Sequence, residues 1–179
     1  MTVLHSARLD LRPVRVDDLA WITSLSADSR VMTTLGGTRS PSQVRDWLNR
    51  ELAQLERYGY CRNLVSCNGE PVGLVGLSRL DFDSGLVPGI EIAWQLAYAH
   101  WGRGFATEAA EVVLQNAFTV HAITELVAIT SVDNLRSRHV MERLGMRQSV
   151  SETFEHPQLP PGHPLRTHLV YRLTLTPQM

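Results

Sequence analysis

The chain has 179 residues, a length typical of one compact domain or of two small ones. Hydrophobic residues make up 44% of the sequence and charged residues 20%, which excludes disordered, collagen-like and coiled-coil chains. The formal net charge is -1, and acids and bases are spread evenly, so nothing indicates binding to nucleic acid. No apolar run approaches the ~20 residues of a membrane span. Residues 1–12 lack the pattern of a secretory signal, so a cytoplasmic location is expected.

All 17 basic residues are arginine. Every fixed positive charge is therefore a guanidinium, which suits phosphate and carboxylate groups, although a bias of the coding sequence explains the same composition. The two cysteines, Cys61 and Cys67, lie in one extended-looking segment that would hold them roughly 20 Å apart. We therefore expect two reduced thiols and no disulfide between them.

Hydrophobic periodicity predicts secondary structure along the whole chain. In chain order, the expected elements are a strand over 8–14, a helix from Asp17 or Asp18 through Leu25, a helix over 41–58, strands over 60–67, 71–82 and 90–96, a helix over 107–119 with Glu108, Glu111 and Gln115 facing solvent, a strand over 125–131, a helix over 134–144, and strands over 146–154 and 167–175.

Turn and cap residues mark the boundaries of these elements. Ser40-Pro41 is a typical helix start and Gly59 a typical helix end. Asn68-Gly69 is the strongest short signal for a hairpin, and Asp83-Ser84-Gly85 indicates a further turn. The order of elements predicts an α+β fold in one domain over 1–179, with a twisted, mixed, mostly antiparallel sheet of about seven strands flanked by about four helices.

A glycine-rich segment, Gly102-Arg103-Gly104-Phe105-Ala106, separates a predicted strand from a predicted buried helix. Small residues there let the backbone approach a ligand, and the free amides of the first helical turn, with roughly half a positive charge from the dipole, form an anion site. A phosphate-containing ligand is expected; the alternative is a turn that only starts a helix. The segment lacks the Gly-x-Gly-x-x-Gly of a dinucleotide-binding loop and the Lys of a Walker loop.

Further segments extend this pattern: Glu91–Leu96, Trp101–Ala109, Asn134–Ser137 and Leu144–Met146. Together they resemble the successive motifs of the GNAT acetyltransferase superfamily, in the branch typified by ribosomal-protein N-terminal acetyltransferases. Residues 8–13 resemble the opening strand of this branch, so the resemblance covers nearly the whole chain. It implies a GNAT-like domain that uses acetyl-CoA as co-substrate and needs no metal.

The resemblance also implies where coenzyme A binds. The glycine-rich segment and the helix start would hold the pyrophosphate, and the preceding strand would splay from its neighbour and pair with the pantetheine arm like an added strand. Asn134 would bond the same arm, although simple capping of its helix is an equally good reading. The implied residues are Ile92, Trp94, Leu96, Trp101, Gly102, Arg103, Gly104, Phe105, Ala106, Thr107 and Asn134.

Two positions depart from the family pattern. Trp101 stands where the wider superfamily has Gln or Arg, and Met141 stands where many relatives place a Tyr as general acid. Ser137 is therefore the nearest candidate to protonate the departing thiolate, as its branch relatives suggest. Because a thiol has a pKa of about 8.5, protonation by water is the alternative.

Attack on a thioester requires a neutral amine, so a base must remove a proton. Glu91 is the first candidate, acting through a water molecule; the alternative is an outward-facing carboxylate on a strand. Histidines that titrate near neutrality are further candidates, and their spacing matches no zinc site. They are His139 and the histidines of the proline-rich stretch that borders the predicted acceptor pocket, His156, His163 and His168.

The basicity of the amine helps to choose an acceptor. At pH 7 a protein α-amine, with a pKa of about 7.8, is roughly one-tenth neutral, whereas a Lys-type amine is neutral in fewer than about one molecule in a thousand. Because no strong base is evident, we expect the α-amine of a protein or peptide N-terminus, acetylated by direct attack in a ternary complex. The alternatives are a small-molecule amine or a non-catalytic acyl-CoA-binding sensor domain. Relatives suggest a homodimer, and no nucleic acid or membrane partner is expected.

Overall fold

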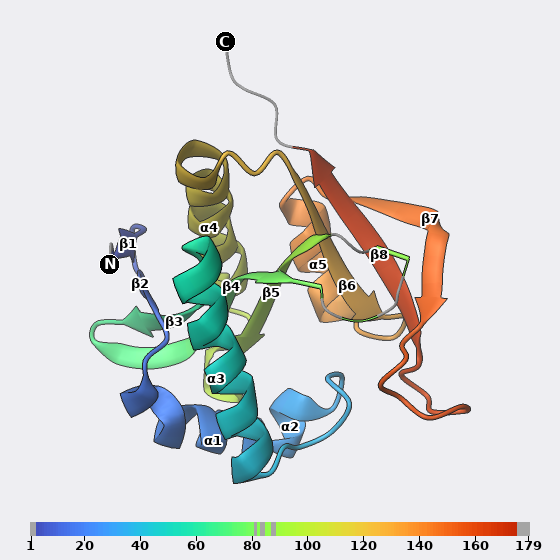
Figure 1. Cartoon of the computed structure of the whole chain (residues 1–179), viewed down its shortest axis with the longest axis horizontal. Helices are drawn as coiled ribbons and strands as arrows, with labels where there is room; N and C mark the ends of the chain where they lie inside the picture. The colour runs from blue at the N-terminus through green and yellow to red at the C-terminus, as the bar shows by residue number, and fades with distance from the viewer. Residues whose placement is uncertain (1–2, 81, 83–84, 87–88, 175–179) are drawn as a thin grey trace.

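The computed structural model describes residues 3–80, 82, 85–86 and 89–174. In this part of the chain, eight strands form one sheet with the order β1-β2-β3-β4-β5-β6-β8-β7 (Figure 1). The strands are β1 (Leu4–His5), β2 (Asp10–Pro13), β3 (Arg62–Cys67), β4 (Glu70–Arg79), β5 (Ile90–Leu96), β6 (Glu125–Ser131), β7 (Arg147–Glu155) and β8 (Thr167–Thr174). The helices are α1 (Leu19–Ala27), α2 (Ser29–Met32), α3 (Pro41–Tyr58), α4 (Phe105–His121) and α5 (Leu135–Arg143), with 3-10 turns at Val16–Asp18 and Tyr98–His100.

The predicted α+β fold is confirmed, but the counts of about seven strands and about four helices were too low for the described residues. The difference comes from β1, which has two residues, and α2, which has four. Neither is long enough to produce a periodic pattern. α2 is instead stabilised locally, because the Asp28 side chain accepts a hydrogen bond from the backbone N–H of Arg30.

Local signals correctly located the longest helix and the hairpin. Ser40 and Gln43 form a reciprocal capping box at the start of α3, and Gly59 ends the helix with a φ of 79°. Asn68 and Gly69 both have positive φ between β3 and β4, as a tight hairpin turn requires. The turn predicted at Asp83-Ser84-Gly85 lies largely outside the described residues.

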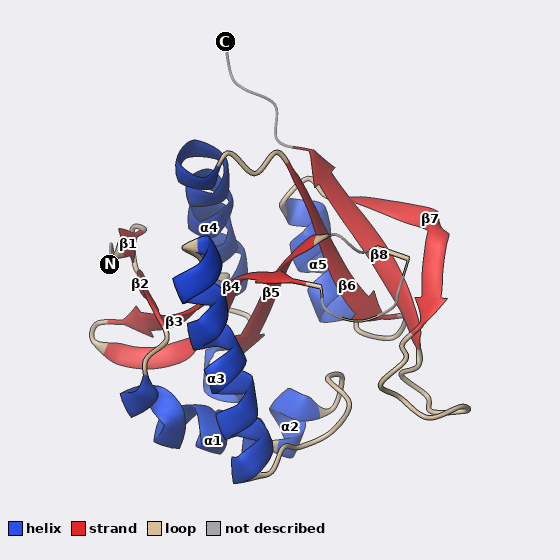
Figure 2. Cartoon of the chain, in the orientation of Figure 1, coloured by secondary structure: helices blue, strands red, loops and turns tan. Residues whose placement is uncertain are grey.

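Hydrophobic clusters lie on both faces of the sheet. Neighbouring strand residues point to opposite faces: Leu64 and Leu74 pack with α1, α2 and α3, whereas Val65 and Val75 pack with α4 and with Met141 of α5. Figure 2 shows α3 and α5 on opposite sides of the strands. A ligand that passes through the sheet would therefore meet two different sets of helices.

The sheet opens between β5 and β6. β4 and β5 are paired in antiparallel register along the full length of β5, whereas β5 and the parallel β6 share one registered pair, Glu91 with Val127. The two strands diverge after this pair. From Ile92 to Leu96, the edge of β5 that faces β6 therefore lacks a partner strand among the described residues. This confirms the expected splay and positions the candidate site.

The predicted thiols are both free, and Cys61 is buried. Burial, followed by the charge of Glu51, raises the pKa of Cys61 to about 12. Within the described segments, no helix combines the length and the hydrophobicity needed to cross a bilayer. The cytoplasmic location stays a prediction.

Candidate active site

A cleft of about 940 Å³ occupies the opening between β5 and β6. Every residue predicted to bind coenzyme A lines this cleft except Arg103, and both predicted catalytic residues, Glu91 and Ser137, line it as well. The start of α4 and α5 borders one part of the cleft. Residues 33–39 and the stretch between β7 and β8 border another part, which we call the acceptor end.

The start of α4 has the geometry of an anion site. Gly104 is its N-cap with a φ of 78°, and Gly102 has a φ of 74°, conformations that suit glycine. The first intrahelical bond runs from the Glu108 N–H to the Gly104 carbonyl. The amides before Glu108 therefore have no partner in their own helix, and the dipole of the 17-residue helix adds positive charge at this end.

Two arginines place further positive charge near this helix start. The guanidinium of Arg103 lies 4.7 Å from the centre of the Phe105 ring, and that of Arg8 lies 4.8 Å from it. Arg103 is therefore stacked on an aromatic ring beside the cleft, and its predicted contact with coenzyme A stays a prediction.

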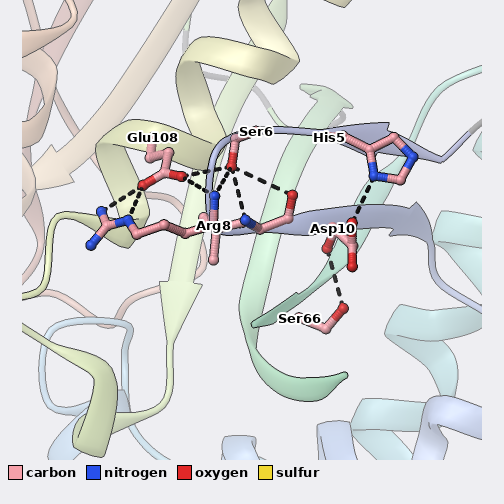
Figure 3. Close-up of polar contacts among 7 residues, drawn as sticks. His5, Ser6, Arg8, Asp10, Ser66 and Glu108 are labelled. Atoms are coloured by element: carbon pink, nitrogen blue, oxygen red, sulfur yellow. Dashed lines mark hydrogen bonds and ion pairs between the residues drawn. The ribbon is translucent and has the colours of Figure 1, made fainter. Parts of the chain in front are cut away.

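The Arg8 side chain also forms an ion pair with Glu108. Figure 3 shows the Glu108 carboxylate accepting hydrogen bonds from Ser6 Oγ at 2.7 Å and from the Arg8 backbone N–H at 3.0 Å. Burial raises the pKa of Glu108, but these hydrogen bonds outweigh it and hold the pKa below its usual value. The expectation that Glu108 faces solvent was wrong, because its carboxylate ties the N-terminal segment to α4.

The Trp101 side chain closes the end of β5. Its indole Nε1 donates a hydrogen bond to the Leu96 carbonyl at 2.9 Å, and the guanidinium of Arg136 lies 4.9 Å from its ring centre. The indole thus holds the loop after β5 against the end of that strand. It also stacks with the Arg136 guanidinium beside the cleft. This accounts structurally for a Trp where the wider superfamily has Gln or Arg.

The start of α5 brings Asn134 and Ser137 into the cleft. Asn134 Oδ1 accepts a hydrogen bond from the Ser137 backbone N–H at 3.3 Å, which confirms the capping role of Asn134. Met141 is 1% exposed and lines the same cleft. Its thioether carries no proton, so Ser137 is the hydroxyl that α5 contributes here.

Glu91 faces inward, so the alternative of an outward-facing carboxylate was wrong. Its side chain is 14% exposed and pairs with Arg62 at 3.2 Å, and the same Arg62 nitrogen donates to Ser78 Oγ at 2.9 Å. Strand register brings these residues together, because Ser78 is opposite Glu91 and Arg62 is opposite Gly76. Sequence reasoning missed Arg62, because no local pattern reveals a partner two strands away.

Of the candidate histidines, His139, His156 and His168 line the cleft, whereas His163 does not. The rings of His156 and His168 lie 4.8 Å apart beside Phe82 and Phe154. Burial and then the charge of His168 lower the pKa of His156 to about 4, and burial lowers the pKa of His168.

At neutral pH these two rings are therefore uncharged and weak as bases. In the described segments, no three His, Cys, Asp or Glu side chains come together as a metal site would require.

Comparisons with known proteins agree with this geometry. A family model described as an acetyltransferase (GNAT) domain matches residues 8–147. Among similar proteins, the uncharacterized protein YkkB of Bacillus subtilis is 30% identical over 151 residues, covering 83% of this chain and 87% of that protein. The spermidine N(1)-acetyltransferase of Escherichia coli is 27% identical over 148 residues, covering 81% of this chain and 75% of that protein.

Among solved structures, the ribosomal L7/L12 α-N-protein acetyltransferase RimL in complex with coenzyme A superposes with a TM-score of 0.79. The match covers 97% of this chain and 98% of that one at 17% identity. This likeness supports the fold, whereas assignment to the ribosomal-protein branch stays a prediction.

Proposed function

The chain belongs to the GNAT acetyltransferase family, and from this premise we propose that it is an acetyl-CoA-dependent N-acetyltransferase acting on an α-amine at a protein or peptide N-terminus. One observation carries the proposal. The start of α4, the open edge of β5, Glu91 and Ser137 all border a single cleft of about 940 Å³. An activated acyl group and an amine can therefore meet at the point where β5 and β6 diverge.

The residues that border the cleft fit coenzyme A. The free amides of α4, with Gly102 and Gly104 at positive φ, suit the pyrophosphate. The open edge of β5 offers backbone groups to the amides of the pantetheine arm. Acetyl-CoA would supply the thioester carbonyl that the amine attacks.

Glu91 would accept a proton from the amine through a water molecule, and Ser137 would donate one to the leaving thiolate. The ion pair with Arg62 supports an ionised Glu91 carboxylate, the form that a base requires. Direct attack is favoured over a thiol intermediate, because neither Cys61 nor Cys67 lines the cleft and the pKa of Cys61 is raised to about 12.

A small-molecule amine is the second candidate acceptor. It is favoured by the similarity to a protein named spermidine N(1)-acetyltransferase. The first candidate is favoured by the lower basicity of α-amines and by the weak bases in this cleft, since burial lowers the pKa of both His156 and His168.

Release of the coenzyme A thiol from acetyl-CoA, measured with a panel of peptide α-amines and free amines, tests the proposal. Glu91→Gln should lower kcat by roughly 10²- to 10⁴-fold, most strongly at low pH, where the amine most needs deprotonation. Glu111→Gln, on an exposed part of α4, is the matched control and should leave the rate unchanged. Coenzyme A binding without thiol release for any amine would favour the sensor domain, and an unaltered pH profile would remove Glu91 from the mechanism.

A further inference from the structure

We propose that the acceptor end of the cleft binds a carboxylate, so that the acceptor is an amine bearing a carboxylate group, and that Arg39 is the residue that binds it. The inference rests on the proposed function and names the substrate class of the same site.

Arg39 is a half-buried cation for which the described part of the chain supplies no acidic partner. It lies between α2 and α3, where its backbone N–H donates to the Ser26 carbonyl at 3.0 Å, and its side chain lines the cleft. Burial, followed by the charges of Arg62 and Arg50, lowers its pKa. No described residue accepts a hydrogen bond from its guanidinium or forms an ion pair with it. Burying an unpaired charge is costly, so an anionic ligand is the partner that this position lacks.

The charges along the cleft point the same way. Among the described residues that line it, Glu91 is the single acid, and it already pairs with Arg62. The Nε of Arg62 is buried and has no hydrogen-bond partner there. Five arginines line the cleft. Arg30 pairs with Asp28 and Arg62 with Glu91, whereas no described acid pairs with Arg39, Arg136 or Arg143. Such a lining repels a polycationic acceptor and attracts an anionic one.

Position assigns Arg39 to the acceptor and not to coenzyme A. Its charge interacts with Arg62, the partner of the candidate base Glu91. It also belongs to the α2–α3 segment, and these helices pack on the face of the sheet opposite to α4. A carboxylate on Arg39 would thus hold the acceptor on the side of the opening away from the start of α4.

The surrounding loops partly enclose this end. A side-chain carbon at Gly36 would lie 3.3 Å from Leu159 Cδ2, so the α2–α3 loop touches the stretch between β7 and β8. The cleft-lining His156 and His168 are neutral at pH 7 and offer hydrogen bonds without charge. Partial exclusion of water strengthens an arginine–carboxylate pair, and the planar guanidinium matches a carboxylate through two parallel hydrogen bonds.

The test compares acceptors that share a side chain and differ at the carboxylate group: leucine, leucinamide and isopentylamine, and the amidated dipeptides Ser-Glu and Ser-Gln. Wild-type kcat/KM should be highest for the acceptors with a carboxylate. For leucine this order opposes amine basicity, because the amide has the less basic amine and would otherwise react faster. Preference for leucine identifies a free amino acid as the source of the carboxylate, and preference for Ser-Glu identifies an acidic peptide N-terminus.

Arg39→Gln should raise KM for the preferred carboxylate acceptor roughly 10- to 100-fold, as expected for loss of a charge-assisted hydrogen bond. KM for leucinamide and the affinity for coenzyme A should not change, and Arg39→Lys should restore part of the loss. Arg45→Gln, on an exposed part of α3, is the matched control.

The inference is overturned by equal kcat/KM for acceptors with and without a carboxylate, or by an Arg39→Gln variant that weakens coenzyme A binding or slows all acceptors alike. If no amine releases thiol, the proposed function fails separately. Calorimetry of leucine and Ser-Glu on protein saturated with coenzyme A then still decides this inference. Heat that disappears in Arg39→Gln supports it, and absence of heat from both ligands overturns it.

Discussion

The backbone and the hydroxyl of Ser137 have separate roles. The backbone N–H completes the α5 cap by donating to Asn134, whereas the side chain contributes to the lining of the cleft. Removing the hydroxyl therefore leaves the cap in place. This separation makes Ser137 a clean position at which to test protonation of the thiolate.

Ser137→Ala should lower kcat about 10²-fold, the lower end of the usual contribution of an acid or base. Its free energy of unfolding should stay within about 0.5 kcal/mol of wild type, as for substitutions that remove no structural contact. Steady-state kinetics over pH and urea unfolding measure the two effects. An unchanged kcat at every pH would assign protonation of the thiolate to water.

Among individual residues, the sequence predicted those whose signal is local and missed those whose role depends on distant contacts. The turn at Gly104 and the helix cap at Asn134 were predictable because each depends on a few neighbouring residues, whereas their contacts with coenzyme A stay predictions. Arg62 reaches Glu91 through strand register, and Arg39 reaches the cleft through a loop. The all-arginine composition suits carboxylate and phosphate groups, but a coding bias explains it better, and it pointed to no particular position.

Among the elements, α5 combines a structural cap with a candidate ligand contact at Asn134. Asp caps a helix as well as Asn does, but it lacks an amide donor, and Ala provides neither group. Asn134→Ala should therefore cost about 1 kcal/mol of stability. Asn134→Asp should keep that stability and bind coenzyme A more weakly. Thermal unfolding and calorimetry separate the roles, and wild-type affinity in Asn134→Asp would limit Asn134 to capping.

An ion pair between Glu152 and Arg172 links β7 to β8, and Arg172 also pairs with Glu125 of β6. The hydrogen bond from Arg172 lowers the pKa of Glu152 to about 2 from an ordinary 4.5. A lowered pKa stabilises the fold above about pH 4.5, and this contribution is lost as pH falls toward 2.

Because the pair is partly exposed, its contribution is on the order of 1 kcal/mol or less. Urea unfolding at pH 7 and pH 3 measures how much free energy of unfolding is lost on acidification. This loss should be smaller in Glu152→Gln than in wild type. Glu70→Gln, at an exposed position, is the control. If wild type and Glu152→Gln lose the same free energy of unfolding between pH 7 and pH 3, the ion pair does not stabilise the fold.

Periodic elements were predictable because burial of one face leaves a repeating pattern. β5 and β6 were located at their observed bounds, and α3 at 41–58. β1 and α2 are held by local contacts and have no such pattern. The register shift of β7 between Ser149 and Phe154 also has no sequence signal that we recognise.

In the whole molecule, chain order and spatial order differ where the site lies. β8 is inserted between β6 and β7, and β5 diverges from the parallel β6. Pairing between distant strands depends on the complete fold. The residues alone therefore predicted the helices and strands, whereas the divergence of β5 from its neighbour was expected only from the family resemblance. A single domain over 1–179 and a homodimer stay predictions.

The central claim is that the start of α4 binds the phosphates of coenzyme A, and Gly104 provides its most direct test. Asn and Asp both tolerate positive φ, and a side-chain carbon there would meet Arg8 at an ordinary 3.6 Å. The two variants thus share the same backbone strain and differ in charge.

Calorimetric titration with coenzyme A should give tight binding for wild type and near wild-type binding for Gly104→Asn. Gly104→Asp should bind coenzyme A at least ~10-fold more weakly, because its carboxylate repels the negatively charged phosphates. Absence of heat from folded wild-type protein at millimolar coenzyme A, or equal affinities for the two variants, would contradict the claim.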